Sequence, residues 1–145
     1  MLENINYMSQ FGPSLCLGLG AVGSCFGCYI AGASAAAAMS RVEEGHAKMA
    51  ALAAAPSIQC MYGCILALVM NQHIRSGDLS YISSIYIGII AGTAFITSAL
   101  LQGKVAAAGI QATMARPAVY GLTWVAVSVL EMFALFAFVF SFLII

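Results

Sequence analysis

The carboxylate of Glu131 is the side chain that most clearly points to chemistry. It is the only acid in the last 29 residues, and it lies midway along the apolar stretch 118–145. That stretch is long enough to cross a bilayer, which takes about 20 residues. An ionised side chain at the centre of a bilayer costs roughly 2.5–3.5 kcal/mol on insertion scales. A carboxylate that a proton or a cation neutralises is cheaper to keep there, so Glu131 is predicted to carry an ion.

Two carboxamides are predicted to lie at the same membrane depth as this carboxylate. Gln102 and Glu131 each lie about 14 residues from a short polar segment around residue 116, which is roughly 20 Å along a helix at 1.5 Å per residue. Gln59 lies about as far beyond a second polar segment, centred near Gly45. Antiparallel helices joined at those segments would bring the three side chains to one level. Three hydroxyl-bearing residues fall within a helical turn of that level: Tyr62, Ser57 and Ser128.

This set of side chains suits a small cation. Carboxamide oxygens can ligate a cation, and the NH₂ groups can donate hydrogen bonds to a carboxylate. Hard cations prefer oxygen ligands, so Glu131, Gln59 and Gln102 would be the metal ligands if the ion is Na⁺. The alternative is that the amides only hold helices together, because an unsatisfied polar group in hydrocarbon is costly.

The composition places the chain in a membrane. Of its 145 residues, 63% are hydrophobic and only 7% are charged, whereas soluble domains carry about 25% charged residues. The net charge is zero, so nothing indicates a nucleic-acid partner. The five cysteines lie in apolar segments and are interpreted as small packing residues. The segment 1–8 has no basic residue, which argues against a cleaved signal peptide.

The elements that must position the site are four transmembrane helices. We expect them at about 11–40, 49–73, 80–114 and 118–145, arranged as two tandem hairpins over residues 1–78 and 79–145. The fold class is therefore an all-α membrane protein. Loops are expected at 41–48, 71–78 and 115–118, with His46 and His73 as solvated loop residues. Lys104 is expected to extend its ammonium toward the nearer membrane surface.

The basic residues predict how the chain is oriented. Arg41, Lys48 and Arg116 lie in the first and third loops, whereas only Arg75 lies on the opposite side. The positive-inside rule therefore places loops 41–48 and 115–118 in the cytoplasm and both termini outside. The chain is expected to be a multi-pass protein of the cell (inner) membrane, in contact with lipid.

The second hairpin looks like a copy of the first. A shift of 71 residues, without gaps, carries Ser57 to Ser128 and places Cys60 opposite Glu131. Only the second hairpin then has the acid, so each chain would carry one ion.

Small residues on the first and third spans predict how the helices pack. Cys16, Gly20, Ser24 and Cys28 follow one another at every fourth position of the first span. Such columns let helices approach closely. They favour a homo-oligomeric ring with the first and third spans inside and the other two outside. A compact monomeric bundle is the alternative.

Three segments resemble the proteolipid subunits of bacterial V-type (V/A-type) ATPases, the duplicated four-helix members of the rotor-ring family. They are Leu-Gln-Gly-Lys-Val-Ala-Ala-Ala-Gly-Ile-Gln at 101–111, the Tyr62-Gly63 pair shortly after Pro56, and Glu131 itself. The resemblance covers nearly the whole chain. It implies a ring of identical copies that turns against a stator subunit, whose arginine releases the ion. A central-stalk subunit would couple the turning to ATP hydrolysis or synthesis, and this chain itself would perform no bond chemistry.

The resemblance also assigns roles to residues. Glu131 matches the ion-carrying glutamate; Gln59, Gln102 and Tyr62 match residues of sodium-binding relatives; and Ala55 matches a position that contributes a backbone carbonyl. Ile58 stands where sodium-binding members have a ligating threonine. Ser57 or Ser128 could replace that hydroxyl.

The missing threonine slightly favours a proton, so the transported ion, H⁺ or Na⁺, stays open, and no resident cofactor is expected. Two other functions stay open: a small four-helix drug/proton antiporter and a purely structural proteolipid.

Overall fold

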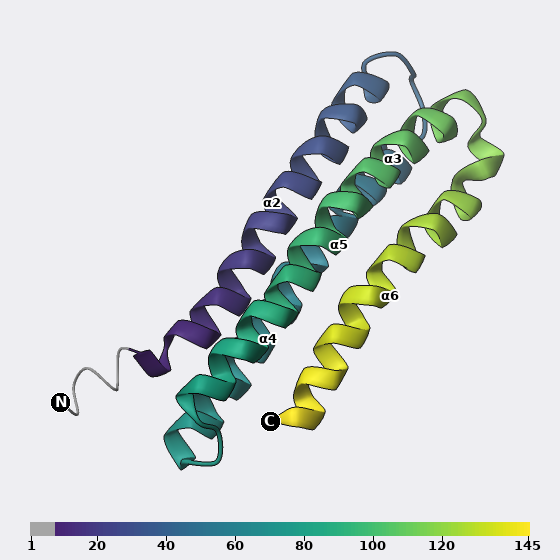
Figure 1. The fold of residues 1–145 in the computed structure, drawn as a ribbon. Helices are drawn as coiled ribbons and strands as arrows, with labels where there is room; N and C mark the ends of the chain where they lie inside the picture. Colours follow the sequence, from purple (N-terminus) through teal and green to yellow (C-terminus); the bar gives the residue numbers. More distant parts are fainter. Residues whose placement is uncertain (1–7) are drawn as a thin grey trace.

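Four long helices lie side by side in one elongated bundle (Figure 1). The computed structural model describes residues 8–145, so the expectation for the segment 1–8 lies almost entirely outside the described residues. The helices long and apolar enough to cross a membrane are Phe11–Met39, His46–Ser76, Tyr81–Ala115 and Pro117–Ile144. The all-α, four-span prediction is confirmed.

The first and third spans are single helices, whereas the second and fourth contain short 3₁₀ turns. The elements are α2 (Phe11–Met39), α3 (His46–Ala54), η1 (Ala55–Ser57), α4 (Ile58–Ser76), α5 (Tyr81–Ala115), η2 (Pro117–Val119) and α6 (Tyr120–Ile144). Both 3₁₀ turns contain a proline near their start, because proline supplies no N–H to the helical ladder. The turns 40–45 and 116 lie at one end of the bundle, and the turn 77–80 lies at the other, where α2 begins and α6 ends (Figure 1).

The second span is longer than the sequence predicted. It begins at His46 and ends at Ser76, so His46 and His73 are helical, and the prediction that they are loop residues is wrong. The reason is that Gly45 (φ 84°) and Gly77 (φ 88°) carry the turns, since glycine adopts the left-handed region without steric cost. Polar residues beside those glycines resemble loop residues in sequence, yet they continue the helix.

The bundle is organised around a close contact between α2 and α5. This pair has the most extensive packing in the molecule, and α4 and α6 pack against it. Glycines from both helices make the contact possible: Gly12 lies against Gly88, and Gly27 lies against Gly103. A Cβ at any of these positions would overlap the backbone of the partner helix. The predicted pairing of the two small-residue spans is therefore present within one chain.

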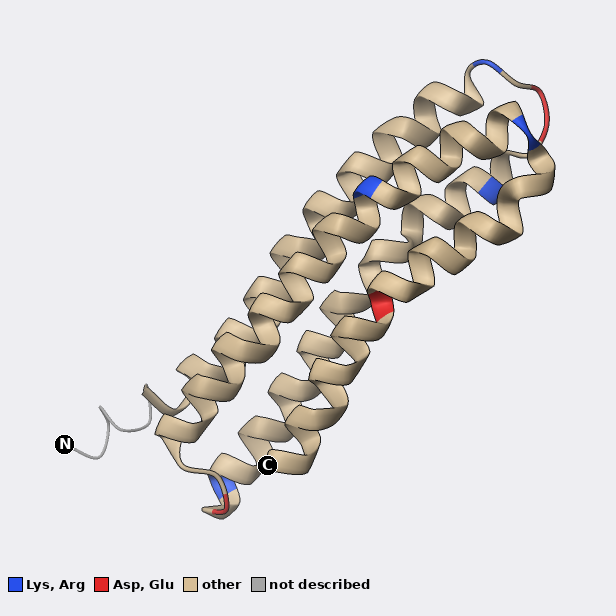
Figure 2. Ribbon diagram, turned by 45° about the vertical axis from the view of Figure 1, so that its right-hand side comes forward, with Lys and Arg blue, Asp and Glu red and all other residues tan. Residues whose placement is uncertain are grey.

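Charged residues concentrate towards the two ends of the bundle, with a single acidic position near its middle (Figure 2). The acid within the fourth span is Glu131, inside α6. The arrangement leaves a long apolar belt, as expected for a chain that spans a membrane.

Candidate functional site

Glu131 is held by a tyrosine from a different hairpin. The Tyr62 hydroxyl, on α4, donates a hydrogen bond to Glu131 Oε1 at 3.1 Å. The Tyr62 ring stacks on Phe138, with 5.1 Å between ring centroids, and tilts against Phe95 at 6.2 Å. Glu131 itself is half-buried. The carboxylate therefore lies at the surface of the chain but has a fixed donor, so it can meet a partner subunit without losing its position.

The two glutamines predicted from their depth contact each other directly. Gln59 Nε2, on α4, donates to Gln102 Oε1, on α5, at 3.0 Å. Gln102 Nε2 in turn donates to the Val127 carbonyl of α6 at 3.2 Å. Both glutamine side chains are fully buried. The predicted common depth of these residues therefore becomes a hydrogen-bonded network across three helices.

Ser98 belongs to this network, and the sequence analysis missed it. Its hydroxyl accepts from Gln59 Nε2 at 3.2 Å and donates to the Leu130 carbonyl at 2.8 Å. Ser98 is 5% exposed. One signal was available in the sequence: Ser98 lies four residues before Gln102, and such residues share one face of a helix.

Gln59 Oε1 has no hydrogen-bond partner among residues 8–145, although the atom is buried. A buried carbonyl oxygen without a donor is costly in an apolar environment. The structure therefore presents an acceptor, next to the polar network, that a cation or a donated proton could satisfy.

The remaining candidate residues lie outside this network. The Ser57 hydroxyl is exposed and donates to the Ala54 carbonyl at 2.7 Å. Ser128 is exposed on α6. The Ala55 carbonyl accepts the Ile58 N–H in the 3₁₀ turn and retains a second lone pair. The structure does not bring the Ser57 or Ser128 hydroxyl to the glutamines.

Lys104 and the cysteines show no link to this network. Lys104 is exposed on α5. All five cysteines are free, with Cys16 buried and Cys25 exposed. Within the described residues, no cluster of three or more His, Cys, Asp or Glu could hold a metal ion.

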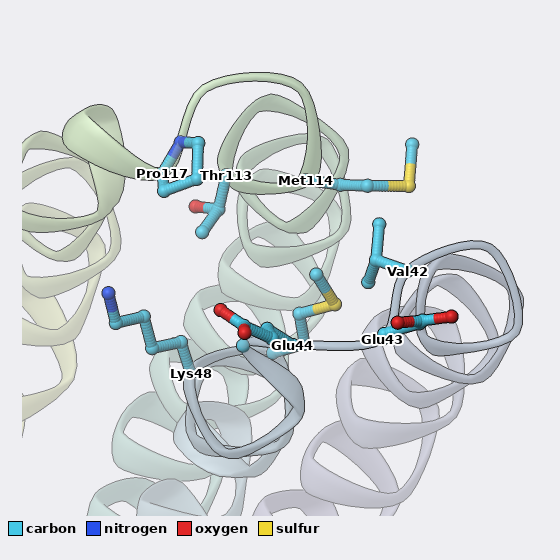
Figure 3. A pocket seen from close by; sticks show the side chains of 9 residues that line it. Val42, Glu43, Glu44, Lys48, Thr113, Met114 and Pro117 are labelled. Carbon is cyan, nitrogen blue, oxygen red and sulfur yellow. The ribbon is translucent and has the colours of Figure 1, made fainter.

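A second polar feature lies at the end of the bundle that carries turns 40–45 and 116. It is a cleft of about 510 Å³, across which side chains from the two turns face one another (Figure 3). Its lining residues are Val42, Glu43, Glu44, Gly45, Lys48, Met49, Thr113, Met114 and Pro117. Thr113 is buried, and its hydroxyl has no partner in the described part of the chain. The cleft is built from residues far along the helices from Glu131, so it is separate from the carboxylate.

Comparison with known proteins gives two matches. The family model for the C subunit of ATP synthase matches the chain twice, over residues 11–70 and 85–144. The V-type sodium ATPase subunit K of Enterococcus hirae is 33% identical over 129 residues, which cover 86% of this chain and 81% of that protein.

The double match confirms the predicted duplication but not its register. The matched segments begin 74 residues apart (85 − 11 = 74), whereas the ungapped shift was 71. The turn of the first hairpin spans residues 40–45, and that of the second is Arg116 alone before η2. Turns of different length cannot overlay without a gap, so the ungapped overlay of the two hairpins is wrong.

Proposed function

The chain belongs to the family of ATP synthase C subunits, and from that premise we propose that Glu131 is the group that binds and releases the transported cation. The chain is the rotor proteolipid of a V-type ATPase: a membrane protein that translocates ions and assembles with other ATPase subunits as part of an oligomeric ring. The observation that carries the proposal is the hydrogen bond from Tyr62 to Glu131, because it fixes a carboxylate in the middle of an apolar span.

The carboxylate works by alternating between two environments. Where Glu131 faces lipid, a bound cation or proton neutralises it, since an uncompensated charge is costly there. Where it faces the stator subunit, an arginine of that subunit favours the free carboxylate and displaces the ion. A membrane potential changes the cost by about 2.3 kcal/mol per charge per 100 mV. Rotation driven by ATP hydrolysis must supply at least that energy when the complex pumps ions.

Na⁺ is the coupling ion that the site supports best. A protonated carboxyl needs one acceptor for its single proton, whereas a dehydrated Na⁺ needs several oxygens. Gln59 Oε1 is buried without a donor, and Glu131, with the second lone pair of the Ala55 carbonyl, adds further oxygens. The relative with 33% identity is a sodium ATPase subunit by name. The orphaned oxygen of Gln59 weighs against the slight sequence-based preference for a proton that Ile58 gave.

The end of the bundle that carries turns 40–45 and 116 faces the cytoplasm, because Arg41, Lys48 and Arg116 lie there and only Arg75 lies at the other end. A central-stalk subunit then docks on that end of the ring. The cleft between the two turns supports this arrangement, since it offers charged and apolar side chains together (Figure 3).

Carbodiimide labelling tests the proposal. Dicyclohexylcarbodiimide attacks a protonated carboxyl in an apolar site, so it should modify Glu131 in the assembled complex and leave Glu43 and Glu44 unmodified. Millimolar Na⁺ at fixed pH should slow that reaction if Na⁺ occupies the site. Labelling of Glu43 or Glu44 with Glu131 untouched would contradict the assignment of the carrier. Labelling of Glu131 that no Na⁺ concentration slows would show that the ion is a proton.

The two other functions are not favoured. A drug/proton antiporter does not account for the double match to the ATP synthase C-subunit family. A purely structural proteolipid does not account for an acid that is fixed by a tyrosine within an apolar span.

A further inference from the structure

The network around Gln59 has a direction that two backbone carbonyls impose. A backbone carbonyl can only accept hydrogen bonds. Gln102 must therefore turn its NH₂ group toward the Val127 carbonyl, which leaves its Oε1 pointing at Gln59. The reversed amide would set two oxygens against each other, so the pattern of partners decides this orientation.

Ser98 repeats the same logic one turn before Gln102 on α5. Its hydroxyl proton is committed to the Leu130 carbonyl, so its oxygen can only accept from Gln59 Nε2. Gln59 therefore faces two acceptors, Ser98 Oγ and Gln102 Oε1, and both hydrogens of its NH₂ group are used. The Gln59 carboxamide is left with Oε1 as the free acceptor of the network.

We propose that Ser98 is a positioning residue for ion binding: by accepting from Gln59 Nε2 while anchored on the Leu130 carbonyl, it holds Gln59 Oε1 available to the cation. The inference rests on the proposed function, because it assumes that Gln59 Oε1 ligates the ion. It also explains how the chain manages without a threonine at Ile58. Ser98 acts through Gln59, and it links the orientation of that amide to the α6 backbone beside Glu131.

The test is Ser98→Ala in the intact ATPase complex, with Ser98→Thr and Thr97→Ala as comparisons. Thr97 is the exposed neighbour of Ser98, and its hydroxyl bonds only within α5, to the Thr93 carbonyl at 2.7 Å. The readouts are the Na⁺ concentration that half-protects Glu131 from carbodiimide, the KM for Na⁺ and the maximal ATPase rate.

Ser98→Ala frees Gln59 to rotate, so both Na⁺ values should rise about 3- to 10-fold, the loss expected from one neutral hydrogen bond. The maximal rate at saturating Na⁺ should stay close to that of the parent. Ser98→Thr keeps the hydroxyl and should restore the parental values, and Thr97→Ala should not change them. If Ser98→Ala does not assemble, Ser98→Cys, with its weak acceptor and donor, is measured in its place and should raise the same two values.

Two results would overturn the inference while leaving the proposed function intact: Na⁺ protection in Ser98→Ala equal to that of the parent, or an equal loss in Thr97→Ala. If Na⁺ fails to protect the parent complex at all, the sodium assignment and this inference both fail, and carbodiimide labelling of Glu131 alone decides whether it is the carrier.

Discussion

At the scale of single residues, the site separates the carrier from the groups that orient it. Glu131 is half-buried and bonds to Tyr62, whereas Gln59 and Gln102 are fully buried and bond to each other. A group that must meet a stator subunit benefits from partial exposure. Groups that keep the geometry benefit from burial, since hydrogen bonds are stronger where water is excluded.

Tyr62→Phe isolates the hydrogen bond to Glu131. The phenyl ring can keep its stacking on Phe138, while the donor to Oε1 is lost. We expect the Na⁺ concentration that half-protects Glu131 from carbodiimide to change by about 3- to 10-fold in the direction of weaker binding. Tyr86→Phe is the matched control, because Tyr86 is an exposed tyrosine on α5. Unchanged protection in Tyr62→Phe would remove Tyr62 from the site.

The residues of the site differ in how visible they are in the sequence. Glu131 and the two glutamines stand out because charged and amide groups are rare in apolar spans and lie at a calculable depth. Ser98 does not stand out, since a serine in a helix can bond to its own backbone, as Thr93 and Thr97 do. Only the positions of α4 and α6 show that the Ser98 hydroxyl serves other helices.

At the scale of elements, close contact between α2 and α5 sets the geometry of the site. Gln102 and Gly103 are neighbours in α5, and Gly103 lies against the backbone of Gly27. The glycine contact therefore fixes the height and rotation of the helix at the residue that orients Gln59. The sequence predicted that the small-residue spans would pair, but the register of that contact depends on side-chain fit and could not be calculated from spacing.

Gly103→Val should disrupt this contact. The added side chain would overlap the Gly27 backbone, and overpacking of this kind costs typically about 1–3 kcal/mol. The solubilised protein should lose thermal stability in a melting assay, and the Na⁺ protection of Glu131 should weaken as well. Gly121→Ala is the control, because nothing lies within 4 Å of a Cβ at that position. Equal melting temperatures for both variants would show that the α2–α5 contact does not limit stability.

The ends of the elements were less predictable than their existence. Polar residues next to Gly45 and Gly77 indicated loops, yet the helix runs from His46 to Ser76. Helix ends are decided by the one residue that leaves the helical region, here a glycine at positive φ, and only weakly by the polarity of its neighbours.

At the scale of the whole molecule, one carboxylate serves four transmembrane helices. The second span, His46–Ser76, contains no acid that could act as a counterpart of Glu131, so each chain carries one ion past the stator. A ring with fewer carboxylates moves fewer ions per turn. Each ion can then draw on a larger share of the energy of ATP, which suits work against a steep gradient.

The orientation of the molecule can be tested with single cysteines in the turns. Glu43→Cys should react with a membrane-impermeant maleimide only from the cytoplasmic side, because Arg41, Lys48 and Arg116 hold that end inside. Asp78→Cys should react only from the opposite side. The parent protein, whose five cysteines lie in helices, gives the background. The reverse labelling pattern would show that the bundle is inverted.

The most direct test of the central claim is ATP-driven uptake of radioactive sodium by vesicles that contain the whole complex with Glu131→Gln. The glutamine nearly preserves the size of the side chain but cannot alternate between a charged and a neutralised state. Uptake should fall to background while the ring still assembles, and Glu44→Gln, in the turn 40–45, should transport normally. Undiminished uptake in Glu131→Gln would show that this carboxylate does not carry the ion.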